Sequence, residues 1–395
     1  MGEIRLWRAR AAEYRIGKTK SAQRKFMKNP ANIMALALAA ALAAAVARGG
    51  ESAQTPDLDW REISEIGTEG QAWKGEKFPY PYARIPLKFK GNVTKNVWAK
   101  SLTPTGMSAT FETDSDQIWI SREFLHGNPS PFWFGNSGFD LYAADKDGNF
   151  RWLATTPIAR IKDNSKTYKL SGLLGGKPRM YRVYLPLRNI LTSAKIGVKK
   201  GSSFKPAPQP AEKPLVFYGT SIVHGAWATH SGLSHPSAIG RMLKMPVVNL
   251  GFSGSAQMET GMAETLATID AAIYVIDATQ NMSEKLVRER CEKFLRRLRE
   301  LRPNTPILVA EEATSATAWY WRDSDGPYLA PKCAAQREIV KRLQSEGDKN
   351  LHYIGGEWLF GKDGEASPDN CHPGDLGMKA MAERFAPAIE KILKK

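Results

Sequence analysis

Three polar side chains have the types that nucleophilic catalysis requires. Ser221 directly follows a short apolar run, and Asp369 and His372 lie three residues apart in the stretch S-P-D-N-C-H-P-G-D. A serine hydroxyl attacks a carbonyl carbon only when a base takes its proton and a third group orients that base. One local bend at 367–375 can place a carboxylate beside an imidazole and fix its tautomer. If the fold brings Ser221 to this bend, the three residues predict acyl-transfer chemistry.

Two further stretches contain donors for the negative oxygen that such a reaction forms. Residues 249–254 read N-L-G-F-S-G, and their glycines let the backbone turn tightly and point the N–H of Gly254 outward. Asn281 could donate its side-chain amide, and the backbone N–H of Ser221 is a third donor. Each feature alone has an ordinary alternative, a helix N-cap for Ser221 and plain turns for the other two. Their combination at the ends of successive strands favours a catalytic serine.

The elements that position these stretches alternate between strand and helix. Because five such repeats follow residue 214, the pattern predicts a parallel sheet with helices on both faces, which keeps its chemistry at the carboxyl ends of the strands. We expect Asp375 to be the N-cap of the last helix. The predicted strands are 215–218, 246–250, 272–277, 306–310 and 351–354, and the predicted helices are 235–244, 258–268, 283–301, 331–343 and 375–393.

The region before this sheet has a different pattern. Residues 60–197 form short alternating runs broken by Gly, Pro, Asn and Asp, with a hairpin signal at 145–149 and no long helical period. We therefore predict an all-β sandwich, jelly-roll-like, at 60–197. The Pro-rich stretch 198–213 is expected to be an extended linker to a catalytic domain at 214–395.

The N-terminal region has the three parts of a signal peptide. A basic region ends at Lys28, an apolar run covers 33–47, and the run closes with Ala-Val-Ala. Residues 1–47 are therefore expected to be a cleaved signal peptide, followed by a polar leader at 48–59. An uncleaved anchor is the alternative, although the apolar run is short for a bilayer. Export would place the protein in the periplasm or outside the cell, with no stable membrane span after cleavage.

Charge and cysteine content limit the partners. The net charge is +16, but residues 1–47 carry nine Lys and Arg against two Glu and so supply +7 of it. The excess therefore does not indicate nucleic-acid binding. The chain has three cysteines; a Cys333–Cys371 bridge is possible, and no CxxC or His/Cys metal spacing is present.

At these residues the chain resembles a known family. The order G-T-S-I, N-L-G-F-S-G, Q-N-M and D-N-C-H-P is similar to the four blocks of the SGNH (GDSL-like) hydrolases. The resemblance implies a flavodoxin-like sheet, with Ser221 as nucleophile, Gly254 and Asn281 in the oxyanion hole, His372 as base and Asp369 as the acidic triad member.

A second motif and two departures refine the resemblance. G-F-D-L-Y at 138–142 resembles the G-x-D-L-Y motif of a β-rich domain that precedes some SGNH esterases. Thr220 replaces the Asp of G-D-S, and Gln280 stands where many relatives have Gly. Neither change removes a group that the mechanism requires. Ser221 lacks the G-x-S-x-G context of an ordinary α/β-hydrolase.

Several other side chains are candidates for the walls of a cleft. His224 lies close to Ser221 in sequence, Trp319 and Trp321 occupy a long loop after the fourth strand, and Asp140 and Tyr142 could reach across from the first domain. Structural roles are the alternative for each: a loop anchored by its tryptophans, or a turn within the sandwich.

Three histidines after Ser221 do not form a metal site. His224, His230 and His235 lack helical or hairpin spacing and a nearby carboxylate or thiolate, so we expect solvent or cleft-wall positions. Neither a metal nor an organic cofactor is implied.

The sequence thus predicts an exported serine esterase that acts on a small-molecule or polysaccharide ester, with acetyl groups on carbohydrate as the favoured substrate. Three alternatives stay open: a lipid or lysophospholipid esterase of the same mechanism, an O-acetyltransferase, and a non-catalytic carbohydrate-binding protein. The oligomeric state does not follow from the sequence.

Overall fold

The computed structural model describes residues 56–126, 134–162, 164–315, 317, 320, 330–361 and 363–394. The predicted signal peptide, most of the polar leader, and Trp319 and Trp321 lie outside these residues. Within the described ranges, we find no helix with the length and apolar character needed to cross a bilayer.

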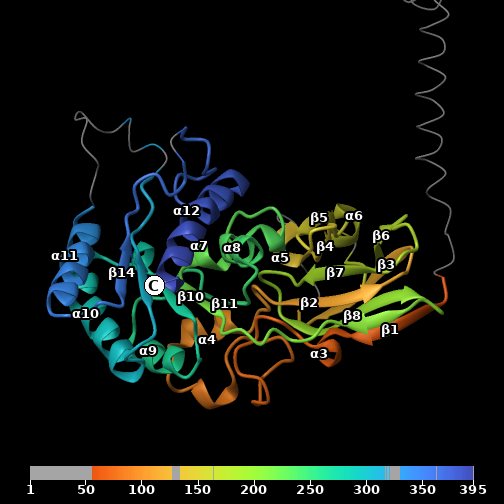
Figure 1. The fold of residues 1–395 in the computed structure, drawn as a ribbon, viewed down its shortest axis with the longest axis horizontal. Helices are drawn as coiled ribbons and strands as arrows, with labels where there is room; N and C mark the ends of the chain where they lie inside the picture. The colour runs from red at the N-terminus through yellow and green to blue at the C-terminus, as the bar shows by residue number, and fades with distance from the viewer. Residues whose placement is uncertain are drawn as a thin grey trace, which may run out of the picture. The chain divides into compact units, whose positions relative to one another are not determined.

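The second half of the chain is built on a five-stranded parallel sheet in the order β11-β10-β12-β13-β14 (Figure 1). This is the flavodoxin-like strand order, in which the first strand lies between the second and third. The predicted fold class is therefore confirmed. The strands are β10 (Leu215–Gly219), β11 (Val247–Gly251), β12 (Ile273–Asp277), β13 (Ile307–Ala310) and β14 (Leu351–Ile354).

Helices cover both faces of this sheet because successive strand residues point to opposite sides. On one face, Val216 and Tyr218 join a core with α9 (Thr260–Ala267), α10 (Glu284–Leu301) and α11 (Pro331–Ser345). On the other face, Leu215 and Phe217 pack with α8 (His235–Leu243) and α12 (Asp375–Leu393) (Figure 1).

The start of α12 corrects one prediction. The helix begins at Asp375, but its N-cap residue is Gly374. Asp375 instead accepts hydrogen bonds from the backbone N–H and the hydroxyl of Thr229, at 2.8 and 2.7 Å. The Asp375 carboxylate, which we expected to cap the helix, therefore binds Thr229, a residue distant in the sequence.

The first half contains two antiparallel sheets, in the orders β1-β8-β3-β6 and β5-β4-β7-β2-β9. Both contribute to one core, with Phe111 and Val183 from one sheet and Ile120 and Ile196 from the other. The predicted sandwich is confirmed, and so is the hairpin of β4 and β5. The strands are β1 (Leu58–Glu62), β2 (Ser108–Thr113), β3 (Gln117–Phe124), β4 (Asp140–Ala144), β5 (Phe150–Thr155), β6 (Thr167–Gly172), β7 (Arg179–Tyr184), β8 (Leu191–Lys199) and β9 (Phe204–Pro206).

Two strands extend beyond the predicted limits of the sandwich. β1 begins at Leu58, inside the expected leader, and pairs with β8. β9 lies inside the expected linker and pairs with β2, and the ring of Phe204 stacks on Phe111 with centroids 4.9 Å apart. Part of the Pro-rich stretch is thus a sheet edge.

A segment between β1 and β2 leaves the sandwich and packs into the core of the parallel-sheet domain. It includes α4 (Lys95–Ser101), and its apolar side chains in that core are Trp73, Ile85, Phe89, Val93 and Val97. Arg84, 2% exposed, donates to the carbonyl oxygens of Asn249 (3.0 Å) and Gly251 (2.7 Å) at the end of β11. Burial lowers its pKa to about 9. Since a buried cation is costly without partners, these carbonyl contacts fix the segment against β11.

Candidate active site

Ser221 lies at the turn from β10 into the short helix α7 (Ser221–His224). Two glycines let α7 approach the neighbouring strand ends. A Cβ at Gly219 would meet the carbonyl oxygen of Asp277 at 2.2 Å, and one at Gly251 would meet the backbone nitrogen of His224 at 2.2 Å. The hydroxyl of Ser221 is therefore held at the carboxyl edge of the parallel sheet, where such sheets carry their sites.

The structure brings Ser221, His372 and Asp369 together. The Ser221 Oγ lies 2.8 Å from His372 Nε2, and His372 Nδ1 lies 2.8 Å from Asp369 Oδ2. With Nδ1–H donating to the carboxylate, Nε2 is free to accept the serine proton. The imidazole and carboxylate side chains are 28% and 33% exposed, so solvent reaches them.

Asp369 is held as a carboxylate by several donors. Its Oδ1 accepts from the backbone N–H groups of His372 (2.7 Å) and Cys371 (3.0 Å), and its Oδ2 also accepts from the indole N–H of Trp227 (2.7 Å). Partial burial raises the pKa of Asp369, but the backbone and ring of His372, the N–H of Cys371 and the indole together hold that pKa well below its usual range. Sequence reasoning missed Trp227, because nothing in its position marks it as a partner of a residue 142 positions away.

The predicted oxyanion-hole residues lie on two connected loops. Gly254 has φ +69°, in the left-handed region that favours glycine, and the space beside its Cα is open. Asn281 belongs to the short helix η3 (Thr279–Asn281), and its Nδ2 donates to the carbonyl oxygen of Ser255 at 2.9 Å. One of the two amide hydrogens of Asn281 therefore fixes the side chain to the Gly254 loop.

The two departures from the family blocks contact each other below the serine. The hydroxyl of Thr220 donates to Gln280 Oε1 at 3.2 Å, and Gln280 Nε2 donates to Asp277 Oδ1. Asp277 is 1% exposed. Burial raises its pKa to about 7, the hydrogen bond from Gln280 opposes this, and Glu312 adds to it. Thr220 and Gln280 thus connect the turn at Ser221 to a buried acid that sequence reasoning did not identify.

His224 is buried, which corrects the expectation of a solvent or cleft-wall position. It is 2% exposed; its Nε2 lies 2.8 Å from the carbonyl oxygen of Leu187, and its Nδ1 lies 3.1 Å from the hydroxyl of Ser253. Burial and the nearby cation of Arg84 lower the pKa of His224 well below its usual value. The neutral ring therefore connects the sandwich to the residue before Gly254.

His235 also differs from the prediction. It is fully buried, with its ring beside those of Phe217 (6.0 Å) and Phe385 (5.9 Å). Burial lowers its pKa to about 3. His235 is buried because it lies on the face of α8 that packs against the sheet, and a neutral imidazole ring can pack among aromatic side chains.

Asp140 and Tyr142 reach the parallel-sheet domain but are buried at 0% and 3% exposure. Asp140 Oδ2 accepts from the backbone N–H of Gly232 (2.6 Å) and lies 2.9 Å from His230 Nδ1. The guanidinium of Arg241 lies 4.4 Å from the ring centre of Tyr142. The G-x-D-L-Y motif therefore holds the segment between α7 and α8, and neither side chain lies at an open surface.

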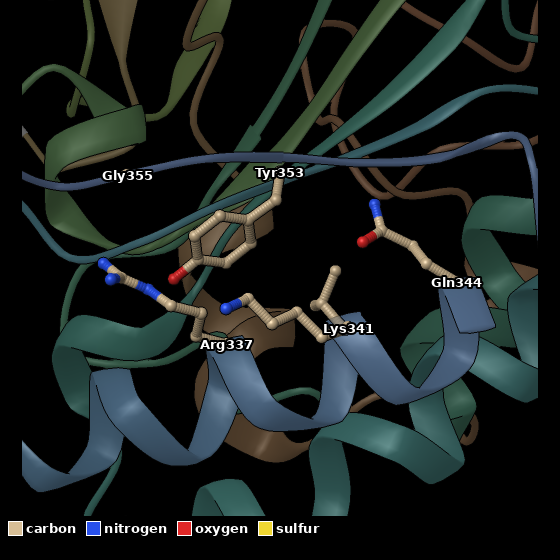
Figure 2. Close-up of a pocket in the computed structure, with 6 residues that line it drawn as sticks. Arg337, Lys341, Gln344, Tyr353 and Gly355 are labelled. Carbon is tan, nitrogen blue, oxygen red and sulfur yellow. The ribbon is translucent and has the colours of Figure 1, made fainter.

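A cavity of about 290 Å³ lies between α11 and β14, with the side chains of Arg337, Lys341, Gln344 and Tyr353 around it (Figure 2). None of its lining residues belongs to the Ser221, His372 and Asp369 group. Among the described residues, no group of three or more His, Cys, Asp or Glu side chains is arranged to hold a metal ion. Cys291, Cys333 and Cys371 are all unpaired in this structure.

Comparison with protein families gives two matches. Residues 212–390 match the GDSL-like lipase/acylhydrolase family, and residues 58–204 match the GxDLY family, described as the N-terminus of SGNH-hydrolase-type esterases. No protein with a curated description matches the chain.

Three solved structures resemble this chain in fold over most of its length. A protein from Bacteroides ovatus described as a GDSL-like lipase is 28% identical with a TM-score of 0.75, and the match covers 86% of this chain and 98% of that one. The salicylyl-acyltransferase SsfX3 from a tetracycline biosynthetic pathway is 16% identical with a TM-score of 0.65, covering 85% and 98%. A family two carbohydrate esterase from Cellvibrio japonicus is 12% identical with a TM-score of 0.55, covering 86% and 99%. For the two structures at 16% and 12% identity, the similarity shows a shared fold and not a shared activity.

Proposed function

We propose that this chain, which belongs to the SGNH (GDSL-like) family of carboxylic ester hydrolases and has a GxDLY-type domain, cleaves esters through Ser221, His372 and Asp369. The observation that carries this proposal is the continuous chain of hydrogen bonds from Ser221 Oγ through the His372 ring to Asp369, with both links at 2.8 Å.

The proposed mechanism assigns one task to each group. Ser221 Oγ attacks the ester carbonyl while His372 Nε2 takes its proton, and Asp369 stabilises the imidazolium that forms. The backbone N–H groups of Ser221 and Gly254 and the second amide hydrogen of Asn281 are the donors that we assign to the oxyanion. His372 then protonates the leaving alcohol, and water repeats the sequence to release the acid and restore the serine.

For the substrate, we propose an acetylated carbohydrate. The signal-like leader suits a protein that meets polysaccharide outside the cytoplasm, and the same two-part fold occurs in a carbohydrate esterase of Cellvibrio japonicus. We likewise propose export, on the basic, apolar and Ala-Val-Ala parts of residues 1–47. Expression in a bacterial host and N-terminal sequencing of the exported protein tests this, and a mature form beginning after Ala47 is the expected result.

Hydrolysis of p-nitrophenyl acetate by the purified protein, with Ser221→Ala alongside, tests the esterase proposal. We expect the substitution to reduce kcat to the background level, because the nucleophile is gone. Equal nitrophenol release by both proteins would exclude Ser221 as the nucleophile.

A substrate panel then separates the remaining classes. Acetate release from acetylated xylan, mannan and pectin is compared with hydrolysis of lipid esters. Faster acetate release from the polysaccharides supports an acetylated carbohydrate as the substrate. Faster hydrolysis of the lipid esters would instead identify a lipid esterase. If acetyl groups pass to an added glycan in preference to water, the protein is an acetyltransferase. Glycan binding without turnover identifies a non-catalytic protein.

A further inference from the structure

The segment that follows the nucleophile helix also contacts the acidic end of the hydrogen-bond chain. Trp227 lies six residues after Ser221, and its indole N–H donates at 2.7 Å to Asp369 Oδ2, the oxygen that also bonds His372 Nδ1 at 2.8 Å. Thr229 donates from its backbone and its hydroxyl to Asp375. Residues 227–229 therefore contact the two carboxylates on either side of His372.

The backbone of this segment is fixed by its neighbours. α7 ends at His224, its C-cap residue Gly225 has φ +92°, and the N–H of Ala226 donates to the carbonyl oxygen of Ser221 at 2.9 Å. Trp227 itself has φ +68°, a left-handed conformation that is unusual for a large side chain. Such a conformation persists only when the surrounding contacts impose it. We therefore infer that the left-handed backbone at Trp227 is kept because it serves the function of this residue.

We propose that Trp227 is a positioning residue, whose indole N–H fixes Asp369 against His372 and limits how tightly that carboxylate holds the imidazolium. This inference rests on the proposed esterase function. A carboxylate oxygen that accepts from two donors is a weaker proton acceptor than one with a single donor.

The chemical type of the side chain suits this role. An indole N–H donates, cannot accept, and does not titrate, so its hydrogen bond persists across the pH range of catalysis. A Lys or Arg in its place would add a full positive charge beside His372 and oppose formation of the imidazolium. Trp227 therefore fixes the orientation of the carboxylate and opposes formation of the imidazolium less than a full positive charge would.

The test is Trp227→Phe, which keeps a planar ring and removes only the donor. We expect kcat for p-nitrophenyl acetate to fall about tenfold, the effect of one lost hydrogen bond to a charged group, with little change in KM. The acidic limb of kcat/KM should move to higher pH, since a less satisfied Asp369 stabilises the imidazolium more strongly. A purely structural role would lower activity without moving that limb.

Two control variants isolate the effect. Trp119→Phe removes an indole hydrogen bond of 2.8 Å to Gln117 on β3 and should change neither kcat nor the pH profile. Thr229→Val removes the hydroxyl that bonds Asp375 but leaves the contacts of Asp369 in place. It should therefore leave the acidic limb where it is.

A measurement independent of turnover separates this inference from the esterase proposal. NMR titration of the His372 ring, assigned with His372→Gln, should show its midpoint at higher pH in Trp227→Phe than in the unsubstituted protein. An unchanged midpoint and an unchanged acidic limb would refute the role of Trp227, whatever the rate. Absence of ester hydrolysis by the unsubstituted protein would refute the proposed function, while the titration would still decide the role of Trp227.

Discussion

Asp277 is the last residue of β12 and lies near the turn at Ser221, and Asp277→Asn tests whether its carboxyl group is held uncharged. The side chain is 1% exposed, its Oδ1 accepts from Gln280, and its Oδ2 has no hydrogen-bond partner among the described residues. Burial raises the pKa to about 7 from an ordinary value of 3.8. Asn has nearly the same shape as the protonated acid and keeps the acceptor that Gln280 uses.

The raised pKa of Asp277 determines whether the free energy of unfolding rises or falls with pH. An acid that binds its proton more tightly in the folded state stabilises the protein fully below pH 3.8, and this contribution is lost as the pH rises through about 7. A shift of about three pH units corresponds to about 4 kcal/mol when both states are ionised. Between about pH 5 and about pH 8, we expect this group alone to reduce the free energy of unfolding by about 2.5 kcal/mol.

Urea unfolding followed by tryptophan fluorescence across this pH range measures the effect. The stability of Asp277→Asn relative to the unsubstituted protein should increase by about 2.5 kcal/mol from the lower to the higher pH. Asp147→Asn, at an exposed hairpin turn, is the matched control and should show no such trend. If Asp277→Asn and the unsubstituted protein keep a constant difference in stability, the buried acid does not carry the raised pKa that we assign to it.

Three further substitutions test the contacts around the site. Arg84→Met should destabilise the protein by about 2 to 4 kcal/mol in urea unfolding, because the carbonyls it bonds stay buried, whereas the exposed Arg61→Met should change stability by less than about 0.5 kcal/mol; equal effects would contradict this account. His224→Phe should lower kcat about tenfold in the p-nitrophenyl acetate assay, because Ser253 loses its hydrogen bond to the ring next to Gly254, which we propose as an oxyanion donor. An unchanged kcat would show that this hydrogen bond does not contribute to catalysis. Gly254→Ala should lower the thermal midpoint, with a cost of about 1 kcal/mol for the positive φ; an unchanged midpoint would show that the turn tolerates a side chain.

The sequence was most informative where local patterns agree with the tertiary fold. The central strands β10, β12 and β13 are largely apolar runs buried on both faces, and turn residues follow the strands, so the existence of the strands and their sequence along the chain could be predicted directly. The bend at 367–375 is local as well, and its carboxylate and imidazole do meet. The approach of Ser221 to His372 followed from the rule that parallel strand ends share one edge.

The sequence was least informative where a residue's partner comes from far along the chain. β9 pairs with β2 and its Phe204 stacks on Phe111, a distant partner that the composition of the Pro-rich stretch does not reveal. Asp375 looked like a helix cap, but its carboxylate bonds Thr229. His224 lies in a core because its two ring nitrogens find partners there, which composition cannot reveal.

Covalent labelling of Ser221 tests the central claim most directly. We predict that a fluorophosphonate, which reacts with activated serines, adds one group to the protein and that peptide mass spectrometry locates it on Ser221. His372→Gln should slow this labelling strongly, because the hydroxyl loses the base that lies 2.8 Å away. Labelling at another residue, or an equal rate in His372→Gln, would contradict the account.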